Sequence, residues 1–175
     1  MAFIYSAGNV ISFADADDVH NIDQRVFEAN EGLTDAIVEE VLIRGTTRII
    51  QNFGASDWWR SYYIRMSGGT YDPLIYNSLG LLPIPDPDPN KILARQADFT
   101  DLCVYYSLSY YLLPKIADFS QQDNAERVKI GFFNEKYRSL FQELIDDGSW
   151  YDWDNGGTIT NQEKMVSRTN VIRVR

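Results

Sequence analysis

Twelve residues near the C-terminus, 152–163, have the residue types and spacing of a calcium-binding loop. Such a loop takes oxygen ligands at its first, third, fifth, seventh and ninth positions, a glycine at the sixth and a bidentate glutamate at the twelfth. Carboxylates, a backbone carbonyl and a hydroxyl would come from Asp152, Asp154, Thr158, Thr160 and Glu163. Gly157 permits the sharp turn at the sixth position. The segment therefore predicts an EF-hand-like calcium site.

Gly156 departs from this pattern, because it offers no side chain at the fifth position and a water would have to complete the shell. The site is therefore expected to be weak. The same stretch has a metal-free interpretation, since Asn155-Gly156 is a preferred hairpin turn and aromatic and apolar residues flank it. EF-hands usually occur in pairs, and the sequence holds no second copy of the loop. The calcium loop and the β-hairpin both remain open at this point.

The overall composition limits the classes of function. The chain has 175 residues with a net charge of −9, a size that suits one domain with a full core. An acidic balance disfavours a protein that wraps nucleic acid by neutralising phosphates. No signal-peptide pattern or long apolar run occurs, so we expect a protein made in the cytoplasm with no membrane partner. Cys103, the single cysteine, lies between apolar neighbours and is predicted to be a core residue.

The sequence gives little support to an enzyme. His20 is the only histidine, and no nucleophile motif accompanies it. The acidic pairs Asp17-Asp18 and Asp146-Asp147 lie at the ends of predicted helices, where solvated surface explains them. We therefore expect a protein without catalytic residues.

Apolar residues at helical spacing predict an all-α fold, a bundle of about four helices. The expected helices span 14–30, 34–53, 91–113 and 123–147. Thr34 is expected to cap the second, Gly54 to end it, Pro114 to interrupt the third and Gly148 to stop the last. The second helix is expected to bury an apolar face that includes Ile37. The last helix is expected to bury one that includes Val128 and Phe132. Residues 1–149 then form the helical domain, and residues 150–175 form a C-terminal extension that contains the loop.

A long proline-rich segment, 67–90, separates two of these helices. Proline at every second position from 83 to 89 forces an extended backbone, and a loop of this length is usually functional or disordered. Its apolar residues favour an arm buried against a neighbouring subunit, and the alternative is an Ω-type loop that packs on its own helices. The candidate contact residues are Tyr76, Leu79, Leu81, Leu82, Pro83 and Pro85.

The C-terminal tail is basic and alternates apolar and polar residues like a short β-strand. Such a tail suits docking on an acidic or edge-exposed partner by strand addition. It could instead complete a hairpin within the chain or be a solvated tail. The candidate contact residues are Arg168, Ile172, Arg173, Val174 and Arg175.

The arrangement of the first 55 residues resembles the head-tail connector proteins of tailed bacteriophages, also called adaptor or head-completion proteins. An acidic opening, Ile11 to Asp18, precedes a helix that ends near Glu31-Gly32-Leu33-Thr34, and the long helix from Ile37 to Phe53 follows. More loosely, the resemblance extends through the helical body to Asp147. The long proline-rich arm departs from the smallest connectors.

The resemblance implies a homo-oligomeric ring, commonly a dodecamer, in the neck of the virion. Such rings bind the portal protein, extend the DNA channel after packaging and offer a surface to tail or neck proteins. Duplex DNA would pass without sequence-specific binding, and an acidic channel wall would let it slide. The alternatives are a neck or tail-terminator component of the virion and a calcium-binding interaction module.

Overall fold

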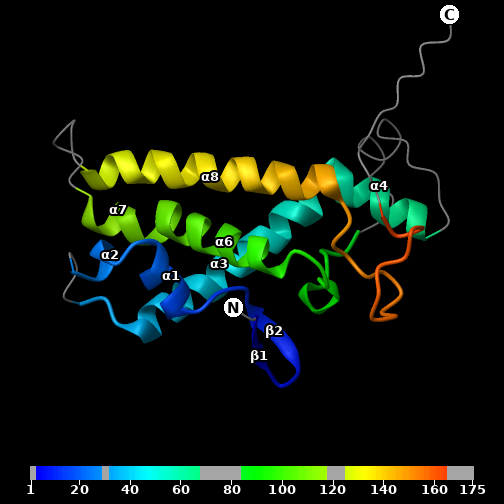
Figure 1. Ribbon diagram of the computed structural model, residues 1–175, viewed down its shortest axis with the longest axis horizontal. Helices are drawn as coiled ribbons and strands as arrows, with labels where there is room; N and C mark the ends of the chain where they lie inside the picture. Colours follow the sequence, from blue (N-terminus) through cyan, green and yellow to red (C-terminus); the bar gives the residue numbers. More distant parts are fainter. Residues whose placement is uncertain (1–2, 29–31, 68–83, 118–124, 165–175) are drawn as a thin grey trace, which may run out of the picture.

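The computed structural model describes residues 3–28, 32–67, 84–117 and 125–164 of the chain. This part is mostly helical with one two-stranded sheet, so the prediction of a broadly all-α fold is confirmed. The helices are α1 (Ala16–Ile22), α2 (Arg25–Glu28), α3 (Asp35–Ala55), α4 (Asp57–Met66), α6 (Gln96–Ser107), α7 (Leu113–Ile116) and α8 (Ala125–Asp147). In Figure 1, α8 runs along α6 and α7, and the first half of α3 lies on the other side of α6.

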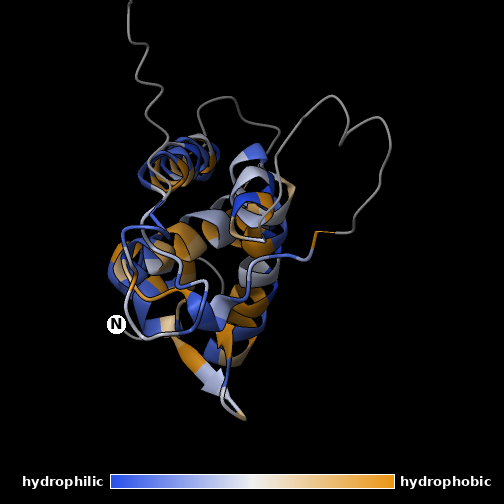
Figure 2. Cartoon of the chain, turned by 90° about the vertical axis from the view of Figure 1, so that its right-hand side faces the viewer, coloured by the Kyte–Doolittle hydropathy of each residue, from blue (hydrophilic) through white to orange (hydrophobic). Residues whose placement is uncertain are grey.

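A β-hairpin at the N-terminus was not predicted from the sequence. Strands β1 (Ile4–Ser6) and β2 (Asn9–Ser12) pair antiparallel and project from the helical body, as Figures 1 and 2 show. Ala7 and Gly8 join them with φ angles of 50° and 83°, the left-handed conformations that a tight hairpin turn requires. The hairpin is tied to the body by the Val10 backbone N–H, which donates to Asn90 Oδ1 at 2.8 Å.

The expected helix over 14–30 is wrong in its continuity, because the chain breaks at Asp23 between α1 and α2. Asp23 has a non-helical backbone, and its carboxylate accepts a hydrogen bond from the Arg25 N–H at 3.2 Å. Its second oxygen binds Lys129 of α8. Aspartate side chains that bond to nearby N–H groups compete with helix continuation, which accounts for the break.

Helix α3 buries the apolar face that its periodicity predicts, including Val38, Leu42, Ile49 and Phe53. Thr34 precedes the helix as its N-cap but makes no side-chain capping bond. The helix passes through Gly54 and ends at Ala55. Gly54 packs closely against Asp86: a Cβ built there would lie 3.3 Å from the Asp86 Cα and 2.0 Å from the Asp86 Oδ1. The helix therefore ends one residue beyond the predicted Gly54.

Pro114 does not stop the helical run that contains it. The π-helical turn η2 (Leu108–Leu112) follows α6, and the Leu113 N–H bonds to the Leu108 carbonyl five residues back. Pro114 then lies in the first turn of α7, where a missing N–H is tolerated. The helical run also begins at Gln96, five residues later than the expected Lys91, because Pro89–Lys91 form the short 3₁₀ turn η1.

Aromatic side chains from distant segments form the core around Phe53, Phe99 and Trp150. Cys103 is fully buried among them as predicted, and burial raises the pKa of its thiol to about 11. In the described residues, no helix has both the length and the apolar character needed to cross a membrane.

Candidate functional site

The C-terminus of α8 leads into the candidate loop, and local contacts fix the direction of the chain at this exit. Gly148 takes a left-handed φ of 56°, and its N–H bonds to the Leu144 carbonyl, so α8 ends where the sequence predicts. Trp150 follows and is fully buried, with its indole N–H donating to the same carbonyl at 2.8 Å. The loop is therefore continuous with the core of the helical body.

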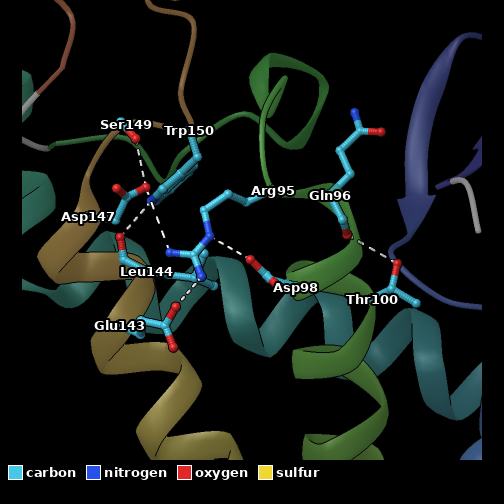
Figure 3. Close-up of polar contacts among 9 residues, drawn as sticks. All are labelled: Arg95, Gln96, Asp98, Thr100, Glu143, Leu144, Asp147, Ser149 and Trp150. Carbon is cyan, nitrogen blue, oxygen red and sulfur yellow. Dashed lines mark hydrogen bonds and ion pairs between the residues drawn. The ribbon is translucent and has the colours of Figure 1, made fainter.

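Arg95 clamps this exit from the side, as Figure 3 shows. Its guanidinium binds Asp98 in α6 and Glu143 in α8, and lies 3.7 Å from Asp147 at the end of α8. Asp147 also accepts a hydrogen bond from the Ser149 hydroxyl at 2.7 Å. Arginine can hold several carboxylates at once through its forked donors. The clamp fixes the start of α6 against the end of α8.

The segment before α6 anchors the first residues of the loop. The Leu93 N–H donates to the Trp150 carbonyl at 3.1 Å, and the Asp152 N–H donates to the Lys91 carbonyl at 2.9 Å. Lys91 Nζ also donates to the Trp153 carbonyl at 2.6 Å. These contacts hold the first acidic residue, Asp152, in a buried position.

Inside the loop, the first two acidic residues bond to backbone N–H groups of the glycine turn. Asp152 accepts from Gly156 at 3.1 Å and from Gly157 at 2.8 Å, one bond on each carboxylate oxygen. The exposed Asp154 accepts from Gly156 at 2.9 Å. Since a carboxylate oxygen has two lone pairs, each of these oxygens retains capacity for a further partner.

Glu163 closes the loop from its other end. One oxygen accepts from the N–H groups of Trp153 and Asp154 at 2.8 and 3.2 Å. The other accepts from the N–H and the hydroxyl of Thr160, both at 2.7 Å. Burial acts to raise the pKa of Glu163, but these hydrogen bonds outweigh it and the pKa lies below its ordinary value. Glu163 is therefore a buried, charged carboxylate at neutral pH.

Three of the predicted ligands come together as a cluster that could hold a metal ion. Carboxylate oxygens of Asp152, Asp154 and Glu163 lie within 4.8 Å of one another. Within the described residues, no lysine or arginine forms an ion pair with any of them. Thr160 touches the cluster through Glu163, whereas Thr158 is exposed in the turn. Among the described residues, the negative charge of the cluster is bound by N–H and O–H groups.

Tyr62 of α4 adds a polar group that the sequence interpretation missed. It is fully buried, and its hydroxyl has no hydrogen-bond partner among the described residues. Its ring makes edge contacts with Tyr151 and Trp153, the residues on either side of Asp152. Burial raises the Tyr62 pKa, and the negative charge of Glu163 raises it further. No sequence signal links Tyr62 to the loop, since 90 residues separate it from Asp152.

The hairpin interpretation of the loop is wrong, because residues 152–164 contain no strand. Tyr151 makes a single bridge with Ile92 and then the chain turns. Asn155 and Gly157 have positive φ angles of 60° and 77°, so the chain does turn here. The N–H groups of Gly156 and Gly157 donate to the Asp152 carboxylate, and no pair of strands is formed.

The described end of the proline-rich segment lies on its own chain. Trp59 Nε1 donates to the Pro85 carbonyl at 2.7 Å, and the Asp88 N–H donates to the Tyr151 hydroxyl at 3.2 Å. Residues 84–90 thus follow the Ω-loop alternative. The other candidate contacts of the arm and tail lie outside the described residues: Tyr76, Leu79, Leu81, Leu82, Pro83, Arg168, Ile172, Arg173, Val174 and Arg175.

Two helices expose apolar side chains that the sequence assigned to buried faces. On α8, Val128 is 67% exposed and Phe132 is 53% exposed. On α3, Ile37 is 39% exposed. Phe133, Tyr137 and Leu144, which the same periodicity includes, do form the buried face of α8. The structure therefore corrects the prediction for Ile37, Val128 and Phe132 and shows apolar surface on two separate helices.

Comparison with protein-family models, with characterised protein sequences and with solved structures gave no match to this chain.

Proposed function

We propose that this protein is a structural subunit of a homo-oligomeric ring in the neck of a tailed bacteriophage, between the portal and the tail. In this role it extends the DNA channel after the genome has been packaged. The resemblance of the first 55 residues to head-tail connectors motivates the class. A net charge of −9 suits a channel wall, because like charges keep the DNA backbone from adhering.

The apolar residues exposed on two different helices are the observation that carries this proposal. Val128 and Phe132 lie on α8, Ile37 lies in the first half of α3, and Figure 1 shows α6 between these two parts. A ring of identical subunits needs two different surfaces on each copy, which meet head to tail. Apolar side chains on a solvent-facing helix surface also favour association. Both features fit a subunit that is incomplete as a monomer.

Native mass spectrometry of the full chain, alone and with portal protein, is expected to detect a closed oligomer, with twelve copies as the number that the connector resemblance implies. Replacing Phe132 with serine should reduce assembly and leave the helical content unchanged, because the ring of Phe132 is exposed. Glu39→Gln on the exposed surface of α3 provides a control that should assemble normally. A chain that remains monomeric with and without portal would contradict the proposal. Assembly without portal binding would favour a tail-terminator role.

We also propose that the loop 152–163 takes up calcium and acts as a structural clamp for the C-terminal segment. The carboxylate cluster has no cationic partner among the described residues, which favours this proposal. Asp152 and Asp154 have lone pairs free for an ion, whereas Glu163 would have to exchange hydrogen bonds for it. Oxygen ligands of this kind suit a hard divalent cation.

Calcium in excess is expected to raise the melting temperature relative to chelator, because an ion that binds only the folded state stabilises it by about 2.7 kcal/mol at roughly 100 times its Kd. Asp154→Asn removes one charge from an exposed ligand and should abolish the shift with little effect on the chelated protein. Glu163→Gln should also abolish the shift. Equal melting temperatures of the wild type in calcium and chelator would refute the calcium proposal and leave the ring proposal untouched.

A further inference from the structure

Helices α3 and α8 each carry an exposed stripe of residues at alternating spacings of three and four. The α3 stripe consists of Ile37, Glu40, Arg44, Thr47 and Gln51. The α8 stripe consists of Val128, Phe132, Glu135, Ser139 and Gln142. Residues at this spacing follow one side of a helix, as in helices that pair along a seam. All ten side chains are exposed, so each stripe is available to another helix.

The two stripes match in chemistry when the helices are aligned in parallel. The common seven-residue spacing places Val128 opposite Ile37, Glu135 opposite Arg44 and Gln142 opposite Gln51. These are an apolar pair, a pair of opposite charges and a pair of amides. The aligned stripes therefore complement one another without a like-charge clash at the matched positions.

Arg44 lies in a hollow that is suited to a carboxylate. Arg44, Thr47, Arg48, Gln51 and Tyr111 line it. The Arg44 guanidinium lies 5.2 Å from the centre of the Tyr111 ring, which the π-helical turn η2 supplies. Within the described residues, neither arginine forms an ion pair with an acidic side chain. Two guanidiniums without a counter-charge favour bidentate binding of an anion.

Glu135 is the acidic residue of α8 that fits this hollow. Glu143 and Asp147 are bound to Arg95, and Asp146 accepts a hydrogen bond from Gln142 at 2.8 Å. The Glu135 carboxylate forms no ion pair with any described residue, and it lies one turn beyond Phe132 on the same side of the helix. It is thus an unpaired carboxylate next to exposed apolar surface.

Duplex DNA is a poorer occupant of the same hollow. Glu39 and Glu40 are exposed on the preceding turn of α3, where they repel phosphates. Binding along a DNA backbone also needs a series of basic side chains, and the hollow offers two. A protein carboxylate next to an apolar side chain fits the α3 stripe better than a DNA backbone does.

Building on the ring proposed above, we infer that the α3 stripe of one copy binds the α8 stripe of the next copy. Glu135 of the neighbouring copy then lies between Arg44 and Arg48, and its Val128 and Phe132 cover Ile37. The contact joins two different surfaces of the same chain, so it propagates from copy to copy until the ring closes.

Charge reversal in the full chain tests the pairing, with the mass distribution measured by native mass spectrometry and sedimentation velocity. Arg44→Glu and Glu135→Arg should each weaken self-association about tenfold or more, because each places like charges together at the contact. The double variant Arg44→Glu/Glu135→Arg should recover assembly, since the pair is restored with its charges exchanged. A mixture of the two single variants should likewise form contacts between unlike copies.

Glu39→Arg serves as the control, because Glu39 is exposed on α3 but lies outside the stripe. It should assemble like the wild type, and circular dichroism should show the same helical content for all variants. Normal assembly of both single variants, or no recovery in the double variant, would overturn the α3–α8 pairing and leave the ring itself standing. A wild-type chain that never assembles would instead refute both the ring and this contact.

Discussion

Replacing Trp150 with alanine is expected to lower the free energy of unfolding by about 3–5 kcal/mol, the usual cost of removing a buried tryptophan. The side chain is fully buried, and its ring centre lies 4.9 Å from those of Trp58 and Phe99. Alanine would leave a cavity between α3, α4 and α6 and would remove the indole bond to the Leu144 carbonyl. Urea denaturation followed by circular dichroism measures the loss.

Trp153→Ala provides the matched control three residues further on. Trp153 is partly exposed and contacts Tyr62 and Tyr63 at the edge of the core. Its loss should lower the free energy of unfolding by about 1–2 kcal/mol, because folding removes less apolar surface from water at Trp153 than at Trp150. Similar losses for the two variants would show that Trp150 does not hold the loop to the core in the way its contacts indicate.

At the end of α8, local chemistry was sufficient to predict the structure. Gly148 ends α8 because its left-handed backbone is one that glycine adopts without strain. The break at Asp23 was missed because an aspartate within a helical period does not by itself signal a break, and the second contact of its carboxylate, with Lys129, lies more than a hundred residues away in the chain. The hairpin of residues 4–12 was missed because Ala7-Gly8 is not among the strong turn pairs and the strands are short. The π-turn has no periodic signal that distinguishes it from a helix interrupted at Pro114.

In the candidate loop, too, features that depend on neighbouring residues could be predicted, and features that depend on distant segments could not. The acidic residues that its spacing selected do converge, because the turn at Asn155 to Gly157 is local. The position of Tyr62 could not be predicted, since it depends on how α4 packs against residues 150–153. Helical periodicity likewise placed Val128 and Phe132 on an apolar face, but it could not show that, in the described part of the chain, their side of α8 is exposed.

The Glu163→Gln variant is expected to be about 2–3 kcal/mol less stable than the wild type at neutral pH and without calcium. Glutamine keeps one acceptor oxygen, but its other terminal group is an NH₂. This NH₂ is a donor and would face N–H groups that are donors themselves. Either the pair from Trp153 and Asp154 or the pair from Thr160 would then lose its acceptor. Thermal and urea unfolding in the presence of a chelator measure this difference.

The difference in the free energy of unfolding between the wild type and Glu163→Gln should also depend on pH. The pKa of Glu163 is lowered in the folded state, so its stabilising contribution is fully present above the unfolded pKa of about 4.3. It is lost as the pH falls through the lower, folded pKa, because protonation removes the charge that the N–H groups bind. The stability gap should therefore be constant from neutral pH down to about 5 and narrow below about 4. Glu39→Gln, on exposed surface, should match the wild type at every pH. A gap that persists unchanged in acid would show that the Glu163 charge does not hold the loop closed.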